Sequence, residues 1–121
     1  MVWGGCTACA GGPDILRGME QVWYMVTATL PDEDTRDAYL EWIQGGHLDH
    51  VIQGGASSAR LVRMDDPARP LEAAAVYTFP SKAAFEAYLR DHAPRLRAEG
   101  LGKFGPQSGV TFRRQVGTIL T

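Results

Sequence analysis

The chain has 121 residues, of which 45% are hydrophobic and 21% are charged, and its formal net charge is −2. This length suits one domain with a substantial core and is too short for two. The near-neutral charge argues against nucleic acid as a partner, because phosphate binding needs clustered Lys and Arg. No apolar run approaches the roughly 18 residues of a membrane span. No Lys or Arg precedes Arg17, so we expect no secretory signal and predict a cytoplasmic protein without a membrane partner.

Residues 1–19 are expected to form a flexible leader or arm ahead of a single domain at residues 20–121. The leader is rich in glycine, whereas Met19 begins MEQVWYMVTATL, which runs straight into a strand. Cys6 and Cys9 form one CxxC, the pattern of half a zinc site or of a redox pair. Zinc would need two more ligands and a redox motif would follow a strand. We therefore assign these cysteines no role.

The first predicted element is a strand over residues 22–30, VWYMVTATL, which is rich in β-branched and aromatic residues and ends at Pro31. Side chains alternate between the two faces of a strand. The more apolar face, expected to lie against the core, carries Val22, Tyr24, Val26, Ala28 and Leu30. The opposite face carries Trp23, Met25, Thr27 and Thr29.

A helix is predicted next, over residues 31–55, with acidic residues in its first turn and Asp32 or Asp34 as its N-cap. Its apolar band contains Leu40, Ile43, His47 and Val51, with Tyr39 and His50 beside it. Gly45 and Gly46 each cost about 1 kcal/mol relative to Ala inside a helix. We therefore expect the helix to bend there, or another group to approach its backbone closely.

The remaining elements are a hairpin, a second helix and a last strand. Strands at 57–65 and 71–79 flank DPARP (66–70), a loop that joins antiparallel strands. The second helix should begin at Ser81, kink or restart at Pro94, and end at Gly100 and Gly102. Residues 108–117 form the last predicted strand.

The order β-α-β-β-α-β is typical of an α+β, ferredoxin-like fold, a four-stranded antiparallel sheet with two helices on one face. Such a fold leaves the other sheet face open, here with Trp23 and Met25 on it. Pairing two sheets face to face is the economical way to cover that face, which predicts a homodimer.

The segments YLEWIQGGHLDHVI, ARLVRM, AVYTF, AYLRDHAPRLRAEGLGKFG and VTFRRQV, in this order, resemble an uncharacterised small bacterial domain family. The resemblance covers residues 20–117, and it places the chain in the dimeric α+β barrel superfamily, beside antibiotic-biosynthesis monooxygenases, EthD-like proteins and stress-responsive barrel proteins. It implies two ferredoxin-like subunits that pack their sheets into a barrel, with a cavity between each sheet and its own helices. The family pattern falls on Trp42, His47, His92, Pro94, Arg95 and Arg97, and because their roles in the family are not established, none of them is taken as catalytic from the resemblance. The leader with Cys6 and Cys9 departs from this pattern.

Three histidines lie on apolar helix faces that cover the same side of the sheet, namely His47, His50 and His92. A neutral imidazole in an apolar cavity is a competent general base. The alternative is a set of buried histidines held by backbone carbonyls or by a carboxylate such as Asp49. A metal set of His47 and His50 with His92 or Asp49 is disfavoured, because helical His pairs usually bind metal at i,i+4 spacing. No metal and no cofactor are therefore expected.

Aromatic residues could form the wall of a small-molecule pocket: Tyr24, Trp42, Tyr77 and Tyr88. As ordinary core residues they would need no function. Arg97 near the end of the second helix could bind an anionic ligand, or it could satisfy the helix terminus or form a structural ion pair, which we favour. Nucleotide-binding glycine motifs and the G-x-S-x-G nucleophile motif do not occur in the sequence.

The sequence thus predicts a homodimeric barrel that binds a small apolar or aromatic molecule between sheet and helices. If it is an enzyme, we expect a monooxygenase- or isomerase-like reaction without a cofactor, with His47 as base and His92 or Tyr77 as orienting donor. His50 and Arg97 are further candidate ligand contacts. The alternative is a non-catalytic domain for dimerisation or partner binding.

Overall fold

The computed structural model describes residues 20–121, so the expectations for the leader and its cysteines lie outside the described residues. The strands are β1 (Val22–Thr29), β2 (Ser58–Arg63), β3 (Glu72–Phe79) and β4 (Thr111–Thr118). The α-helices are α2 (Glu33–Trp42), α3 (Leu48–Gln53), α4 (Lys82–Asp91) and α5 (Ala93–Phe104). A π-helical turn, η1 (Ile43–His47), joins α2 to α3, and a 3₁₀ turn, η2 (Pro106–Ser108), precedes β4.

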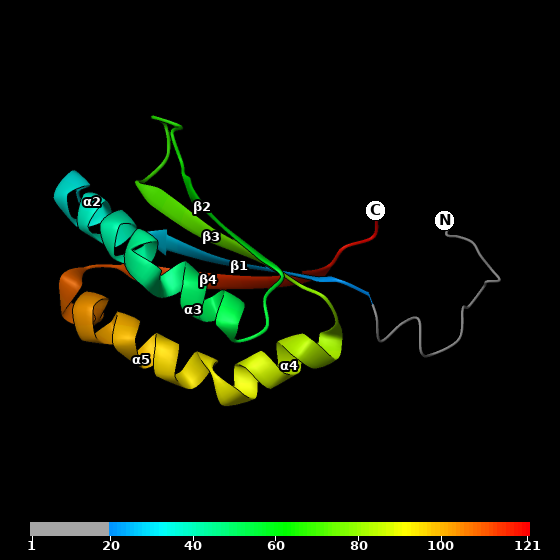
Figure 1. The fold of residues 1–121 in the computed structure, drawn as a ribbon. Coiled ribbons are helices and arrows are strands. Elements are labelled where there is room, and N and C mark those ends of the chain that lie inside the picture. Colours follow the sequence, from blue (N-terminus) through cyan, green and yellow to red (C-terminus); the bar gives the residue numbers. More distant parts are fainter. Residues whose placement is uncertain (1–19) are drawn as a thin grey trace.

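The four strands form one antiparallel sheet in the order β2-β3-β1-β4, and the helices cover one of its faces (Figure 1). The long, apolar β1 is central because it pairs with both β3 and β4 over its whole length. This arrangement confirms the predicted α+β, ferredoxin-like fold, and the predicted strands differ from the observed ones mainly at their ends. The largest difference is at β4, which begins at Thr111 because Gly109 turns the chain with a φ of 82°.

The first helical segment begins and bends where the sequence predicts. The Asp32 side chain caps α2 by accepting a hydrogen bond from the backbone N–H of Thr35 at 2.7 Å. At Gly46 the backbone leaves helical geometry with a φ of 135° and a ψ of −13°, so the helix is kinked inside η1. Only glycine adopts such a φ without strain. In Figure 1, α2 and α3 follow one another along the same side of the sheet on either side of this kink.

The second helical segment begins at the predicted cap but ends later than predicted. Ser81 accepts a hydrogen bond from the Ala84 backbone N–H at 3.0 Å, and α5 starts with Pro94 in its first turn. The prediction that the segment ends at Gly100 and Gly102 is wrong, because α5 continues to Phe104. A Cβ on Gly100 would lie 3.4 Å from Cη2 of Trp42, so this glycine permits close packing of α5 on the Trp42 ring. Packing between helices outweighs the local cost of glycine here.

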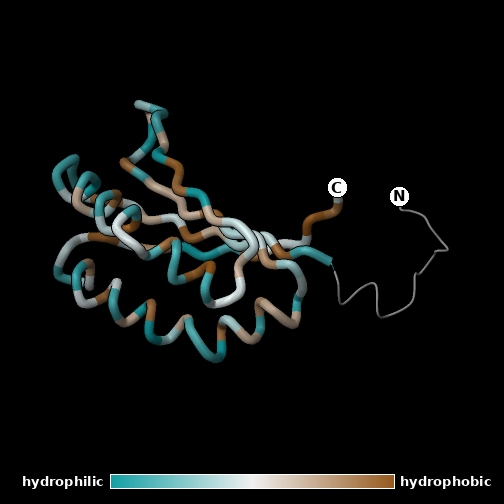
Figure 2. The backbone as a smooth tube through the Cα atoms, in the orientation of Figure 1, coloured by the Kyte–Doolittle hydropathy of each residue, from teal (hydrophilic) through white to brown (hydrophobic). Residues whose placement is uncertain are grey.

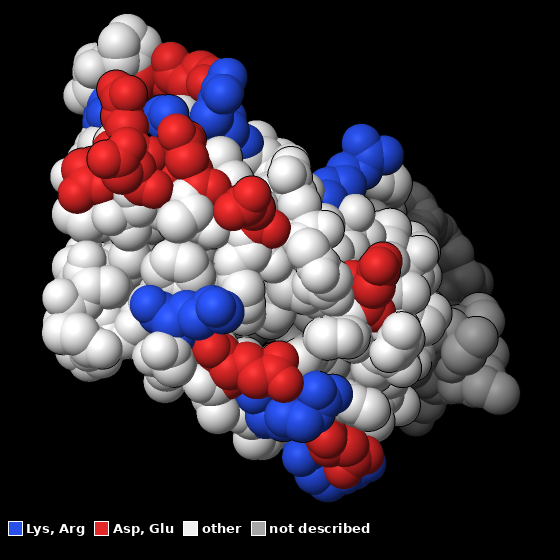
Figure 3. Space-filling view, turned by 60° about the vertical axis from the view of Figure 1, so that its left-hand side comes forward, with Lys and Arg blue, Asp and Glu red and all other residues white. Residues whose placement is uncertain are grey.

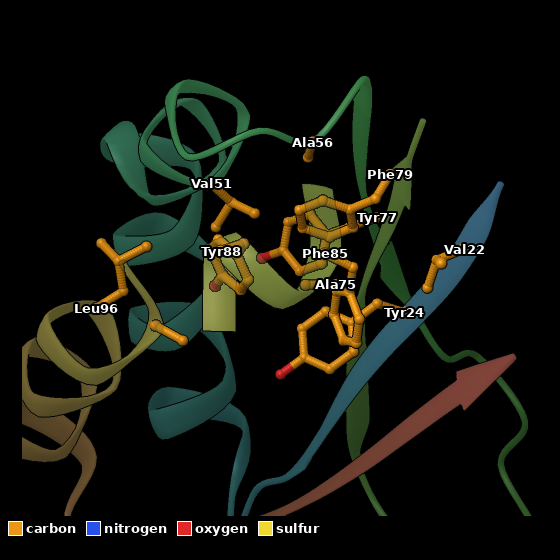
Figure 4. Close-up of a cluster of buried hydrophobic side chains, with 11 residues drawn as sticks. Val22, Tyr24, Val51, Ala56, Ala75, Tyr77, Phe79, Phe85, Tyr88 and Leu96 are labelled. Atoms are coloured by element: carbon orange, nitrogen blue, oxygen red, sulfur yellow. The ribbon is translucent and has the colours of Figure 1, made fainter. Parts of the chain in front are cut away.

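The core lies between the sheet and the helices and consists of two groups of side chains. Figure 4 shows the first, in which Tyr24 and Tyr77 project from the strands toward Tyr88 of α4. The second lies nearer the other end of the sheet and contains Ala28, Leu30, Tyr39, Ile43, Ala73, Phe104 and Val110. Hydrophobic and hydrophilic residues alternate along the backbone of the helical layer (Figure 2), as expected for helices with one buried face.

The sheet face opposite the helices has an uncharged centre, formed by Trp23, Met25, Thr27, Ala74 and Val76. Arg60 of β2 and Arg113 of β4 flank this centre as register neighbours of Val76 and Thr27. We call these seven residues the open sheet face. The Thr27 hydroxyl is buried within it and has no hydrogen-bond partner among the described residues.

Charged side chains on the face shown in Figure 3 gather in separate groups, with acidic residues concentrated at the upper left and a broad uncharged area beside them. On this face Lys and Arg lie beside Asp and Glu and form no continuous basic patch. Within residues 20–121, no helix has the length and apolar character needed to cross a membrane.

Candidate functional site

A cavity of about 60 Å³ lies between the helix-covered face of the sheet and the helices. Strands β1, β3 and β4 supply its floor, and α2, η1, α4 and α5 supply its walls. Its lining consists of Tyr24, Val26, Tyr39, Trp42, Ile43, His47, Ala75, Tyr77, Tyr88, Leu96, Arg97, Gly100, Leu101, Phe112 and Arg114. We call it the tyrosine cavity.

The floor is built by the alternation of β1 and β3. Tyr24 and Tyr77 are register partners on neighbouring strands, and their rings stack with centroids 5.9 Å apart. Tyr88 projects from α4 in the helical layer and packs edge-on against Tyr24, with ring centroids 6.4 Å apart (Figure 4). The three predicted tyrosines therefore surround one cavity.

Three tyrosines of the cavity, Tyr39, Tyr77 and Tyr88, are held in their neutral form. Burial raises the pKa of Tyr88 to about 12, although Arg97 and Arg114 act in the opposite direction. Burial also raises the pKa of Tyr39 to about 12, with Arg114 again opposing, and it raises the pKa of Tyr77 further. These hydroxyls keep their protons at neutral pH and can donate hydrogen bonds to a ligand.

The helix kink places His47 against Trp42, with ring centroids 4.7 Å apart. Burial lowers the pKa of His47, and the neighbouring His50 lowers it further, while Glu99 opposes the change. His47 is therefore neutral at neutral pH. Its Nδ1 atom is buried and has no hydrogen-bond partner in the described part of the chain. The sequence predicted an orienting donor for His47, but neither His92 nor Tyr77 forms a hydrogen bond with it there.

Arg97 extends from α5 across the cavity and donates a hydrogen bond through Nη2 to the Tyr24 hydroxyl at 3.3 Å. The ion pair that we favoured for Arg97 is not seen among residues 20–121. The neighbouring Arg95 makes one instead, with Glu99 at 3.5 Å. Arg97 thus joins a helix to a strand through an aromatic hydroxyl.

Six of the eight predicted site residues line the tyrosine cavity, namely Tyr24, Trp42, His47, Tyr77, Tyr88 and Arg97. The other two, His50 and His92, are not in the lining. The His92 ring stacks on Tyr88 with centroids 6.5 Å apart, and a Cβ on Gly54 would lie 3.1 Å from His92 Cγ. The three histidines therefore do not converge on one cavity. No three His, Cys, Asp or Glu side chains of the described residues cluster as metal ligands.

Sequence reasoning did not identify Arg114, Tyr39 or Phe112 as lining residues. Alternation in the last strand carried the signal for two of them, because Phe112 and Arg114 are register partners of Ala28 and Val26 on the core face of β1. An arginine in line with core positions indicates a polar function on that face.

The family model described as "Domain of unknown function (DUF4286)" matches residues 21–119. No curated protein matches the chain. Among solved structures, a dimeric ferredoxin-like protein from an uncultured marine organism superposes with a TM-score of 0.62 at 12% identity. That match covers 84% of this chain and 97% of the other.

Two further structures share the fold. The EthD family protein of Bacillus halodurans has a TM-score of 0.63 at 12% identity, over 83% of this chain and 99% of its own. SnoaB of Streptomyces nogalater, a cofactor-independent oxygenase, has a TM-score of 0.57 at 13% identity, over 84% of this chain and 95% of its own. These likenesses confirm the resemblance to EthD-like and oxygenase-like ferredoxin folds. Because the family model spans most of the sequence, this protein belongs to the DUF4286 family.

Proposed function

We propose that the protein is a homodimer in which each subunit binds a small apolar or aromatic molecule in its tyrosine cavity. The observation that carries the proposal is the composition of the cavity wall. Aromatic and aliphatic side chains dominate it, and a few polar groups from Tyr24, His47 and Arg97 point into the same space. Most small-molecule sites have this combination.

The size of the cavity limits the ligand or requires movement on binding. Its 60 Å³ is well below the roughly 300 Å³ at which typical ligand pockets begin. Arg97 and Leu101 are exposed, and Trp42 is half-buried against Gly100. All three side chains belong to helices, so their rotation would widen the cavity and leave the strands in place.

Catalysis is an extension of this proposal. A cofactor-independent oxygenase shares the fold, and His47 is the group suited to accept a substrate proton, because its lowered pKa keeps it neutral. Nδ1 of His47 has no orienting partner in the described residues, and catalytic bases usually have one. Ligand binding is therefore supported by the whole cavity lining, whereas proton transfer is supported by His47 alone.

The homodimer forms by pairing of the open sheet faces. The uncharged centre of this face includes Trp23, Met25 and Val76, which no helix covers, and sheets commonly pack face to face. The dimeric ferredoxin-like neighbour supports a dimer. The alternative, dimerisation without a ligand, uses the same face and leaves the tyrosine cavity unused. The expected cytoplasmic location remains a prediction from the sequence.

Native mass spectrometry of the full, untagged chain tests both parts together. We expect a dimer that carries one added small-molecule mass per subunit. In parallel, phenol titrated into ¹⁵N-labelled protein should shift amide signals of cavity residues, and those of α3 should stay unchanged. A dimer without added mass, and without phenol shifts at the cavity, would favour the non-catalytic alternative. A monomer would contradict the barrel.

A further inference from the structure

We propose that the tyrosine cavity selects ligands with a carboxylate, which Arg97 and Arg114 bind at its mouth. This inference rests on the proposed function, because it names the class of molecule that occupies the same cavity. The ligand class is a small aromatic carboxylate.

The charged residues of the lining all have the same sign. Arg97 and Arg114 line the cavity, and no Asp or Glu is among the lining residues. The protein as a whole is slightly acidic, with 14 Asp and Glu against 12 Lys and Arg. The cavity is therefore locally positive on a chain whose net charge is negative, which favours an anion over a neutral or cationic ligand.

Neither arginine has a carboxylate of its own. The ion pairs within residues 20–121 use Arg36, Arg63, Arg90 and Arg95, each with an acid at most four positions away. Arg97 and Arg114 have no acid within 4 Å there. Both are exposed in part, so water satisfies them when the cavity holds no anion, and an entering carboxylate replaces that water.

The two guanidinium groups come from distant parts of the chain and act on the same tyrosine. Arg97 lies on α5 and Arg114 on β4, yet both lower the pKa of Tyr88 against the effect of burial. The hydrogen bond to Tyr24 holds one Nη atom of Arg97, which leaves other N–H groups of its planar fork free. A guanidinium fork matches the two oxygens of a carboxylate.

The neutral tyrosine hydroxyls complete the anion site. Tyr39 and Tyr88 remain protonated to high pH, so they donate hydrogen bonds to an anion and do not repel it. Behind them, the apolar floor with Val26, Ala75 and Phe112 would contact the ring of the ligand once the cavity has widened. The cavity thus offers cationic donors at its mouth and an apolar interior. These two features are complementary to the carboxylate and the ring of an aromatic acid.

Benzoate and benzamide test this inference, since they have nearly the same shape and differ in charge. Binding of each to the full chain is measured by isothermal titration calorimetry at low ionic strength, with amide chemical shifts to locate the site. We expect benzoate to bind at least tenfold more tightly than benzamide. Arg97→Met and Arg114→Met should each reduce that preference, and the double variant should abolish it with little change in benzamide affinity.

Arg95→Met is the matched control, because Arg95 lies two positions from Arg97 on the same helix and outside the cavity lining. It should keep the full preference for benzoate. Equal binding of both probes at the cavity would overturn the anion site and leave the proposed function intact. Benzoate binding that survives the double variant would place the anion elsewhere and also overturn the inference. If neither benzoate nor benzamide binds, the result counts against the proposed function itself.

Discussion

His47 is a half-buried imidazole whose surroundings decide its charge. It packs on Trp42 at 4.7 Å, and burial followed by His50 lowers its pKa, with Glu99 opposing. From the lowered pKa up to the ordinary value of 6.5, the unfolded chain binds a proton that the folded protein does not. The contribution of His47 to the free energy of unfolding is therefore fully present above pH 6.5, and it is lost as the pH falls through the lowered pKa.

The pH dependence of unfolding tests this account of His47. Urea unfolding of the wild type and of His47→Gln at pH 8, 7, 6 and 5 gives the free energy of unfolding of each. We expect the wild type to lose stability relative to the variant as the pH falls below 6.5. His50→Gln should weaken this relative loss without removing it, because His50 is the second cause of the shift. Parallel profiles of wild type and His47→Gln would show that His47 is not held neutral.

At the scale of elements, the kink at Gly46 is what brings His47 over the cavity. A straight helix from α2 to α3 would have no residue with a φ of 135° and no π-helical turn. π-helical turns inside helices frequently occur at functional sites. The two glycines of this turn have different tasks, because Gly46 has the positive φ and Gly45 does not.

The variants Gly45→Ala and Gly46→Ala distinguish the roles of the two glycines through their effects on the free energy of unfolding. A Cβ meets no atom within 4 Å at either position, so packing does not distinguish the variants. Gly45→Ala should raise the free energy of unfolding by up to about 1 kcal/mol through helix propensity. Gly46→Ala should lower it by about 1 kcal/mol or more, because alanine does not tolerate that φ. Chemical denaturation measures both, and equal effects would show that the kink is absent in solution.

At the scale of the whole molecule, the proposed homodimer depends on the open sheet face. The five side chains of its uncharged centre are half-buried or buried although no helix covers them, whereas Arg60 and Arg113 at its edges are exposed. A second copy of the same sheet would bury this centre, and the arginines at its edges would remain near solvent.

Charge placed in this centre should dissociate the dimer. We expect Met25→Glu to weaken the dimer at least a hundredfold, measured by sedimentation velocity over a range of micromolar concentrations, because the register neighbours of Met25 are Val76 and Gln115 and the new carboxylate would be buried with no cation opposite it. Ile52→Glu is the control, since Ile52 is an apolar residue of α3 with 42% of its surface exposed. It should leave the dimer unchanged. If Met25→Glu stays dimeric with the same affinity, the dimer does not use this face.

The sequence by itself determined what depends on neighbours along the chain. Alternation in β1, the caps Asp32 and Ser81, and the breaks at Gly46 and Pro94 are local effects, and they sufficed for the order of elements and the fold. They also indicated which aromatic side chains face the helices.

Only the tertiary structure decided what depends on contacts between distant segments. The bond from Arg97 to Tyr24 spans 73 positions, the packing of Gly100 on Trp42 extends α5, and Arg114 joins the cavity only once β4 pairs with β1. His92 was excluded from the cavity by its stacking on Tyr88. Such contacts follow from how helices pack on the sheet in three dimensions, and helical spacing alone does not contain that information.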